Sequence, residues 1–110
     1  MARSKSYKED LIESLKDLDE SVEYLNASLE DGDPEVFLLA LRDVAEARGG
    51  GMTKLSEKTK LNRENLYKIL SEKGNPALTS LETLLDALGL RLSIQSKEIP
   101  AHHSEQSVSV

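Results

Sequence analysis

Residues 52–70, MTKLSEKTKLNRENLYKIL, constrain the fold of this chain more than any other stretch. Their pattern predicts two short helices joined by a tight turn. The first helix is expected to begin at Thr53, whose hydroxyl can cap the free amides of its first turn, and to end at about Thr59. Asn62 suits the N-cap of the second helix, which is expected over about residues 62–71.

The second of these helices has two faces of different character. Its apolar stripe consists of Leu66, Ile69 and Leu70. Its opposite face carries the long polar side chains of Arg63, Glu64, Tyr67 and Lys68. Such side chains supply the hydrogen-bond donors, acceptors and phosphate partners that reading the major groove of DNA requires. The pattern favours a DNA-binding helix-turn-helix with its recognition helix at about 62–71, while a solvated helix face is the alternative reading.

The rest of the fold is predicted to be helical as well. The chain of 110 residues suffices for one modest core, and it contains only three Tyr and one Phe. A core built from Leu, Val, Ile and Ala suits packed short helices better than a sandwich or a barrel. We therefore expect an all-α fold, a compact bundle of five to six helices.

The residue inventory argues against several classes of protein. The chain has no Cys, and its only two His residues, His102 and His103, lie near its end. Neither a disulfide framework nor a Cys/His or Ser/His/Asp catalytic site is expected, and no metal or other cofactor is expected either. No apolar run approaches the ~20 residues that span a bilayer, and MARSKSYKED lacks the apolar region of a secretory signal. We expect a cytoplasmic protein that is not an enzyme and does not contact a membrane.

Charge is segregated along the chain. Residues 7–48 contain 4 Lys/Arg and 13 Asp/Glu, a net charge of −9, whereas residues 52–75 contain 6 and 3, a net charge of +3. A basic segment on the predicted reading helix fits contact with phosphates. The acidic segment could repel DNA, attract a basic protein partner, or be no more than a solvated pair of helices.

The end of the folded region shows a different pattern from the helices. Residues 90–95, LRLSIQ, alternate apolar and polar residues with period two, which predicts one short β-strand. A lone strand has no partner within the chain, so it either pairs with another subunit or lies extended over the core. Pairing across a two-fold axis would make Leu90, Leu92 and Ile94 part of a dimer interface.

The chain is expected to divide into four parts. Residues 1–6 are predicted to be a disordered N-terminus, and residues 7–32 to form acidic helices. Residues 33–96 are predicted to form the helix-turn-helix domain, beginning with Asp33 as an N-cap before Pro34. Residues 97–110 are predicted to be a disordered tail.

Three motifs carry a resemblance to a known family: NRENLYKIL, the GNP sequence with the Thr that follows it, and LLDALGLRLS. Over roughly residues 19–96 the chain resembles the addiction-module antidote family, which is related to HigA-type antitoxins and to phage-repressor-like regulators. The resemblance implies a lambda-repressor-like helix-turn-helix protein, usually dimeric, that represses its own promoter and suppresses a small toxin. Two residues depart from the family pattern: Ser56 stands where Ala is usual, and Lys60 stands where Gly usually makes the left-handed turn.

The resemblance also implies roles for individual residues. The positions of Arg63, Glu64, Tyr67 and Lys68 face the DNA groove in similar proteins. The positions of Thr53 and Asn62 lie where helix starts meet phosphate. Lys54 and Lys58 are also assigned to DNA contact, because they are positively charged and close to these positions.

The leading hypothesis is a dimeric repressor and antitoxin that binds an operator in double-stranded DNA and a cognate small toxin. Two alternatives stay open: a protein-interaction antidote that no longer depends on DNA, and an orphan phage-type regulator without a toxin.

Overall fold

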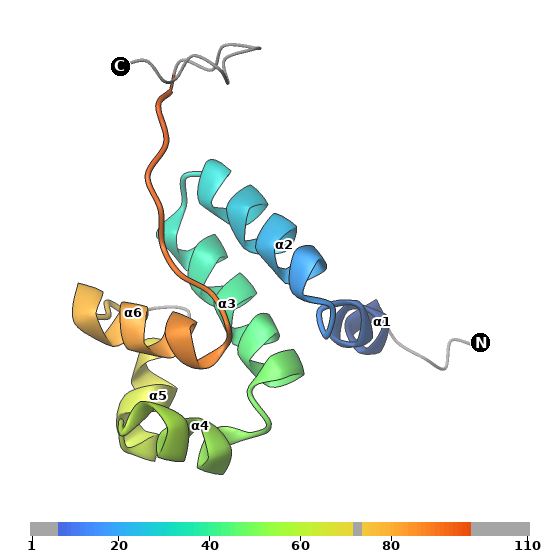
Figure 1. Cartoon of the computed structure of the whole chain (residues 1–110). Helices are drawn as coiled ribbons and strands as arrows, with labels where there is room; N and C mark the ends of the chain where they lie inside the picture. Colours follow the sequence, from blue (N-terminus) through green and yellow to red (C-terminus); the bar gives the residue numbers. More distant parts are fainter. Residues whose placement is uncertain (1–6, 72–73, 98–110) are drawn as a thin grey trace.

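The computed structural model describes residues 7–71 and 74–97, and within them all regular secondary structure is α-helical (Figure 1). Its six helices are α1 (Tyr7–Ser14), α2 (Leu18–Glu30), α3 (Pro34–Arg48), α4 (Met52–Thr59), α5 (Arg63–Ile69) and α6 (Leu78–Ala87). The prediction of an all-α bundle of five to six helices is confirmed. The predictions for residues 1–6 and 98–110, including His102 and His103, lie outside the described residues.

The core is made mainly of leucine, as the composition predicted, with Phe37, Ile69, Val44 and two alanines among it. Helix α3 packs against α2 and α1 on one side, and α4 packs against α5 and α6. The most deeply buried large side chains are Leu15, Leu41, Val44, Leu55, Leu66, Leu70, Leu84 and Leu88. Because these residues come from nearly every part of the described chain, one continuous core fixes the position of the α4–α5 pair.

The helix starts are set by short polar side chains in some cases and by backbone in others. Asp33 caps α3, its carboxylate accepting a hydrogen bond from the Glu35 amide at 2.9 Å, and Pro34 occupies the first turn as predicted. The predicted capping role of Thr53 is wrong. Helix α4 already begins at Met52, and its N-cap is Gly51 with φ of 101°, so no side chain caps it. The run of three glycines lets the chain turn sharply enough to start α4 one residue early.

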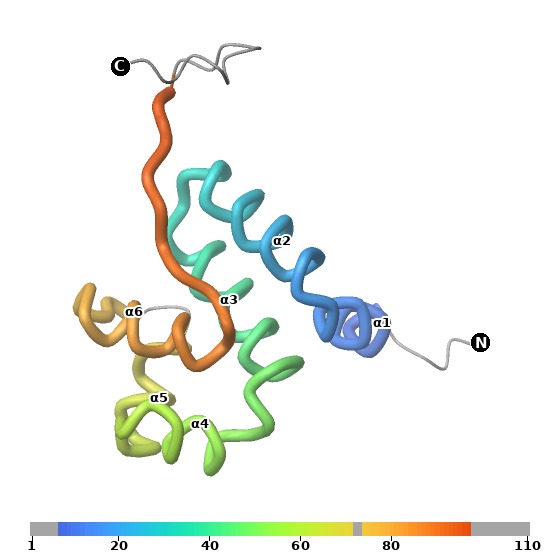
Figure 2. Tube along the Cα trace, viewed as in Figure 1, coloured from blue at the N-terminus to red at the C-terminus, as the bar shows by residue number. Residues whose placement is uncertain are grey.

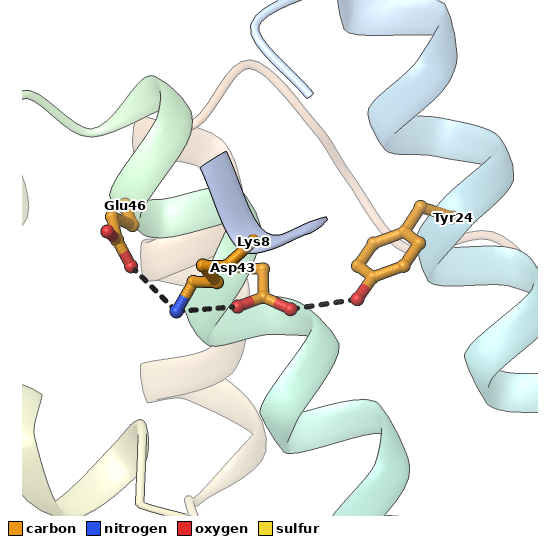
Figure 3. Close-up of polar contacts among 4 residues, drawn as sticks. All are labelled: Lys8, Tyr24, Asp43 and Glu46. Carbon is orange, nitrogen blue, oxygen red and sulfur yellow. Dashed lines mark hydrogen bonds and ion pairs between the residues drawn. The ribbon is translucent and has the colours of Figure 1, made fainter. Parts of the chain in front are cut away.

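A polar cluster joins α1 and α2 to α3 (Figure 3). The Tyr24 hydroxyl donates a hydrogen bond to Asp43 Oδ2 at 2.8 Å. Lys8 Nζ lies 3.7 Å from Asp43 Oδ1 and 3.5 Å from Glu46 Oε1. Partial burial, followed by the hydrogen bond to the Asp43 carboxylate, raises the pKa of the Tyr24 hydroxyl well above its ordinary value. Tyr24 is therefore held in its neutral, donating form.

Arg48, the last residue of α3, connects three parts of the fold. Its Nε donates a hydrogen bond to the Leu88 carbonyl oxygen at 3.1 Å, at the end of α6. Its Nη1 donates to the Lys16 carbonyl oxygen at 2.8 Å, in the turn between α1 and α2. One guanidinium thus satisfies backbone acceptors that lie 40 and 32 residues away in sequence.

The predicted strand at residues 90–95 is not formed. The described residues contain no β-strand, and this segment instead leaves α6 as an extended chain that runs past α3 and α2 (Figure 2). The alternation of Leu90, Leu92 and Ile94 indicated extended backbone correctly, but a strand also needs a ladder partner, and the described residues place only helices beside this segment. In the single chain the segment lies extended, with Leu90 packed against the core, Leu92 39% exposed and Ile94 98% exposed, and its pairing with another subunit stays a prediction.

Candidate nucleic-acid interface

The corner between α4 and α5 is closed by a set of short-range hydrogen bonds. Lys60 has φ of 66°, the left-handed conformation that its place in the turn requires, and its amide donates to the Ser56 carbonyl oxygen at 2.9 Å. Ser56 Oγ donates to the Leu61 carbonyl oxygen at 2.7 Å. Thr59 Oγ1 donates to the Leu55 carbonyl oxygen at 2.7 Å and accepts from the Leu61 amide at 3.1 Å. The amides of Lys60 and Leu61 and the carbonyl of Leu61 are thereby paired, without the glycine that such a corner usually contains.

Helix α5 is held against the core by its apolar stripe. Leu66, Ile69 and Leu70 are buried, as predicted. Asn62 is the N-cap, as also predicted, and its Oδ1 accepts a hydrogen bond from the Asn65 amide at 2.8 Å. These contacts leave the opposite face of α5 turned to solvent.

All eight side chains predicted to contact DNA are exposed on the α4–α5 pair. Thr53, Lys54 and Lys58 lie on α4, and Arg63, Glu64, Tyr67 and Lys68 lie on α5, with Asn62 at the start of α5. Lys54 and Lys58 share one face of α4 because they are four residues apart. Tyr67 has 55% of its surface exposed, which is a large fraction for an aromatic side chain.

The cations of this surface have no described ion-pair partners. Within the part of the chain that the structure describes, the ion pairs involve α1, the turn after it and α3: Lys8 pairs with Asp43 and Glu46, and Lys16 pairs with Glu13. Residues 52–71 contain five Lys/Arg and two Asp/Glu, so the exposed surface of α4 and α5 is basic. We call this surface, made of Thr53, Lys54, Lys58, Asn62, Arg63, Glu64, Tyr67 and Lys68, the basic face.

Sequence reasoning missed two features beside the basic face. One is the set of hydrogen bonds that closes the predicted corner, because Ser56 was recognised only as a departure from a usual Ala and its bond to the Leu61 carbonyl has no sequence signal. The other is a polar hollow of about 400 Å³ between the end of α5 and the start of α6, lined in part by Asn65, Lys68 and Ser80. Asn75 and Pro76 also line this hollow, and in the sequence they indicated only a turn.

Other kinds of site receive little support from the described residues. Among them, no group of three or more His, Asp or Glu side chains is arranged to hold a metal ion. None of the described helices has the length and apolar character needed to cross a bilayer.

A comparison with known families covers most of the chain. Residues 5–96 match the family described as probable addiction module antidote protein. The chain belongs to this antidote family. A relative from Haemophilus influenzae (strain ATCC 51907 / DSM 11121 / KW20 / Rd), described as an uncharacterized protein, is 36% identical over 86 residues, which cover 78% of this chain and 87% of the relative. No solved structure matches the chain.

Proposed function

We propose that this chain is the DNA-binding antitoxin of a type II toxin-antitoxin module, which represses its own operator in the cytoplasm and neutralises a small toxin. The observation that carries the DNA-binding part is the basic face, whose cations are exposed and have no ion-pair partner among the described residues, on a corner closed by internal hydrogen bonds. Membership of the antidote family supports the toxin as a partner.

In this proposal α4 and α5 act as a helix-turn-helix. Helix α5 enters the major groove, with Arg63, Glu64, Tyr67 and Lys68 directed at bases and nearby phosphates. Thr53, Lys54, Lys58 and Asn62 contact the phosphate backbone on either side. Because the corner is formed before binding, little conformational entropy is lost when DNA is bound.

Arg63 lies in the first turn of α5, where side chains of a recognition helix chiefly contact bases, so we assign it to reading a guanine edge. The substitution Arg63→Ala tests this. It is expected to cost about 1–3 kcal/mol of binding free energy for the operator, to relax preference at one base pair, and to leave the salt dependence nearly intact. A phosphate-bound Arg63 would instead weaken binding to all sequences evenly and lower the salt slope by about one unit.

The assay measures affinity for the operator and for random DNA at three or more salt concentrations. Arg42 supplies a matched control, since it is an exposed arginine on α3 outside the basic face. Arg42→Ala should leave both affinities unchanged. Equal affinities of wild type and Arg63→Ala for both DNAs would remove Arg63 from the interface.

Two copies are proposed to bind one operator, with half-sites about one helical turn, roughly 34 Å, apart. Footprinting upstream of the chain's own gene tests this, and the absence of protection at low salt would refute it. Dimerisation through Leu90, Leu92 and Ile94 stays a prediction, to be checked by sedimentation of the chain alone.

A second candidate function is favoured by the acidic segment. Residues 7–48 carry a net charge of −9, and a protein-interaction antidote could use them to bind a basic toxin without contacting DNA. Co-expression with the small protein of the neighbouring reading frame separates the candidates. Growth rescue that survives loss of Arg63 and Tyr67 favours toxin binding independent of DNA, whereas DNA binding with no toxin in that test favours an orphan regulator.

A further inference from the structure

An apolar trough lies on the side of the molecule formed by α2 and the extended segment 90–95. A hollow of about 550 Å³ is lined by Val22, Leu29, Phe37, Leu85 and Leu90, among others. A second hollow of about 300 Å³ continues it toward Pro34, and the two share Leu29, Phe37 and Leu92. We call these two hollows together the trough. Two of the side chains that line both hollows are accessible to solvent: Leu29 is 50% and Leu92 39% exposed.

The extended segment gives the trough an edge that can bind another backbone. Leu90 donates its amide to the Leu85 carbonyl oxygen at 2.8 Å, but the described residues offer no backbone partner to residues 91–95. A row of unpaired amides and carbonyls in extended conformation is a template for a strand from another chain. Alternate side chains of that strand would enter the trough.

The charges around the trough determine which partner fits. Helix α2 contains four carboxylates and no Lys or Arg, and Asp31 and Asp33 follow it directly. Glu30 and Asp33 line the trough itself, against a single Arg91. A second copy of this chain would bring its own acidic α2 and its net charge of −6, so the two surfaces would repel each other, which argues against the dimer contact predicted for Leu90, Leu92 and Ile94. A partner strand rich in Lys or Arg would not.

We infer that the trough and segment 90–95 are the docking site for the toxin, which adds a basic, amphipathic strand to residues 91–95 and places its apolar side chains over Leu29 and Leu92. This inference rests on the proposed antitoxin function. It assigns toxin binding to the side formed by α2 and segment 90–95, while α4 and α5 keep the DNA.

Single arginine substitutions in the trough wall test the inference. The probe is the small protein encoded by the neighbouring reading frame, titrated with the full chain. Leu29→Arg and Leu92→Arg place a charge where apolar toxin side chains are expected, and each should weaken toxin binding at least about tenfold. Leu78→Arg is the matched control, because Leu78 is 61% exposed on α6 and does not line the trough. It should bind the toxin like wild type.

Charge reversal provides a second, independent measurement. Glu30→Lys should weaken toxin binding, whereas Glu57→Lys, an exposed position on α4 outside the trough, should not. Circular dichroism and thermal unfolding of every variant verify that the fold is retained, which is expected because the replaced side chains are at least partly exposed.

The possible outcomes separate this inference from the proposed function. If the wild-type chain does not bind the neighbouring protein, the antitoxin proposal fails and the inference fails with it. If wild type binds and Leu29→Arg and Leu92→Arg bind equally well, only the inference is overturned. If the chain alone sediments as a dimer and the same two substitutions make it a monomer, the trough is the dimer interface, and the toxin assignment is again overturned.

Discussion

Replacing Arg48 by Met tests how the two ends of the molecule are held together. The guanidinium donates to the Leu88 carbonyl oxygen at the end of α6 and to the Lys16 carbonyl oxygen between α1 and α2. Methionine keeps much of the apolar stem but removes both donors. The Leu88 bond is partly buried and the Lys16 bond is exposed, so water can replace the second more completely than the first.

The expected loss of stability follows from that difference. A hydrogen bond from a charged donor contributes about 1.5–3 kcal/mol when it is shielded from water and less when it is exposed. We therefore expect Arg48→Met to lower the free energy of unfolding by about 2 kcal/mol, which corresponds to a fall in Tm of about 10 °C for a domain of this size. Arg48→Lys keeps the charge but cannot reach both carbonyls in a fork, and it should lose about half as much.

Urea unfolding followed by circular dichroism measures these changes. Arg42→Met is the control, since Arg42 is an exposed arginine of the same helix for which no described residue provides an ion pair or hydrogen bond. It should change stability by less than about 0.5 kcal/mol. Equal stabilities of Arg48→Met and Arg42→Met would refute the idea that Arg48 fastens α6 to the N-terminal helices.

Three further predictions concern single positions. Burial and the Asp43 carboxylate raise the pKa of Tyr24. The extra free energy of unfolding of wild type over Tyr24→Phe should therefore be fully present below about pH 10 and should shrink as the pH rises further. A difference that stays constant with pH in unfolding experiments contradicts this. Lys60→Gly should raise the free energy of unfolding by up to about 1 kcal/mol, since Lys60 has φ of 66°, and a lowered Tm would disprove the strain. Gly49→Ala should lower the free energy of unfolding by about 1–3 kcal/mol, because the added Cβ would lie only 2.8 Å from Leu55 Cδ1 and also close to the Ala45 carbonyl oxygen. A variant that unfolds at the wild-type urea midpoint would exclude that clash.

The helices could be predicted from the sequence because their information is local. The apolar spacing of Leu66, Ile69 and Leu70 on α5, and the cap and proline at the start of α3, act over one or two turns. The exposure of the basic face followed from the same spacing, because the residues opposite a buried stripe must face solvent. Whether that face contacts DNA is a property of a partner, which spacing does not determine.

The parts that could not be predicted depend on residues far apart or on the backbone. Arg48 binds two main-chain carbonyls, and a carbonyl has no sequence signature that marks it as a partner. The segment 90–95 alternates like a strand, but whether it gains a ladder partner depends on what lies beside it in space. Thr53 lost its expected role because three preceding glycines allowed α4 to begin at Met52.

In the α4–α5 corner, the side chains that stabilise the turn and the side chains that face outward are different residues. Ser56, Thr59 and the apolar stripe of α5 hold the turn together, and Arg63 and Tyr67 take no part in doing so. Substitutions at the outward positions can therefore accumulate without loss of stability. If the basic face binds DNA as proposed, a lineage of such proteins can change the DNA sequence it recognises while its scaffold stays the same, so that related modules in one genome come to ignore each other's operators.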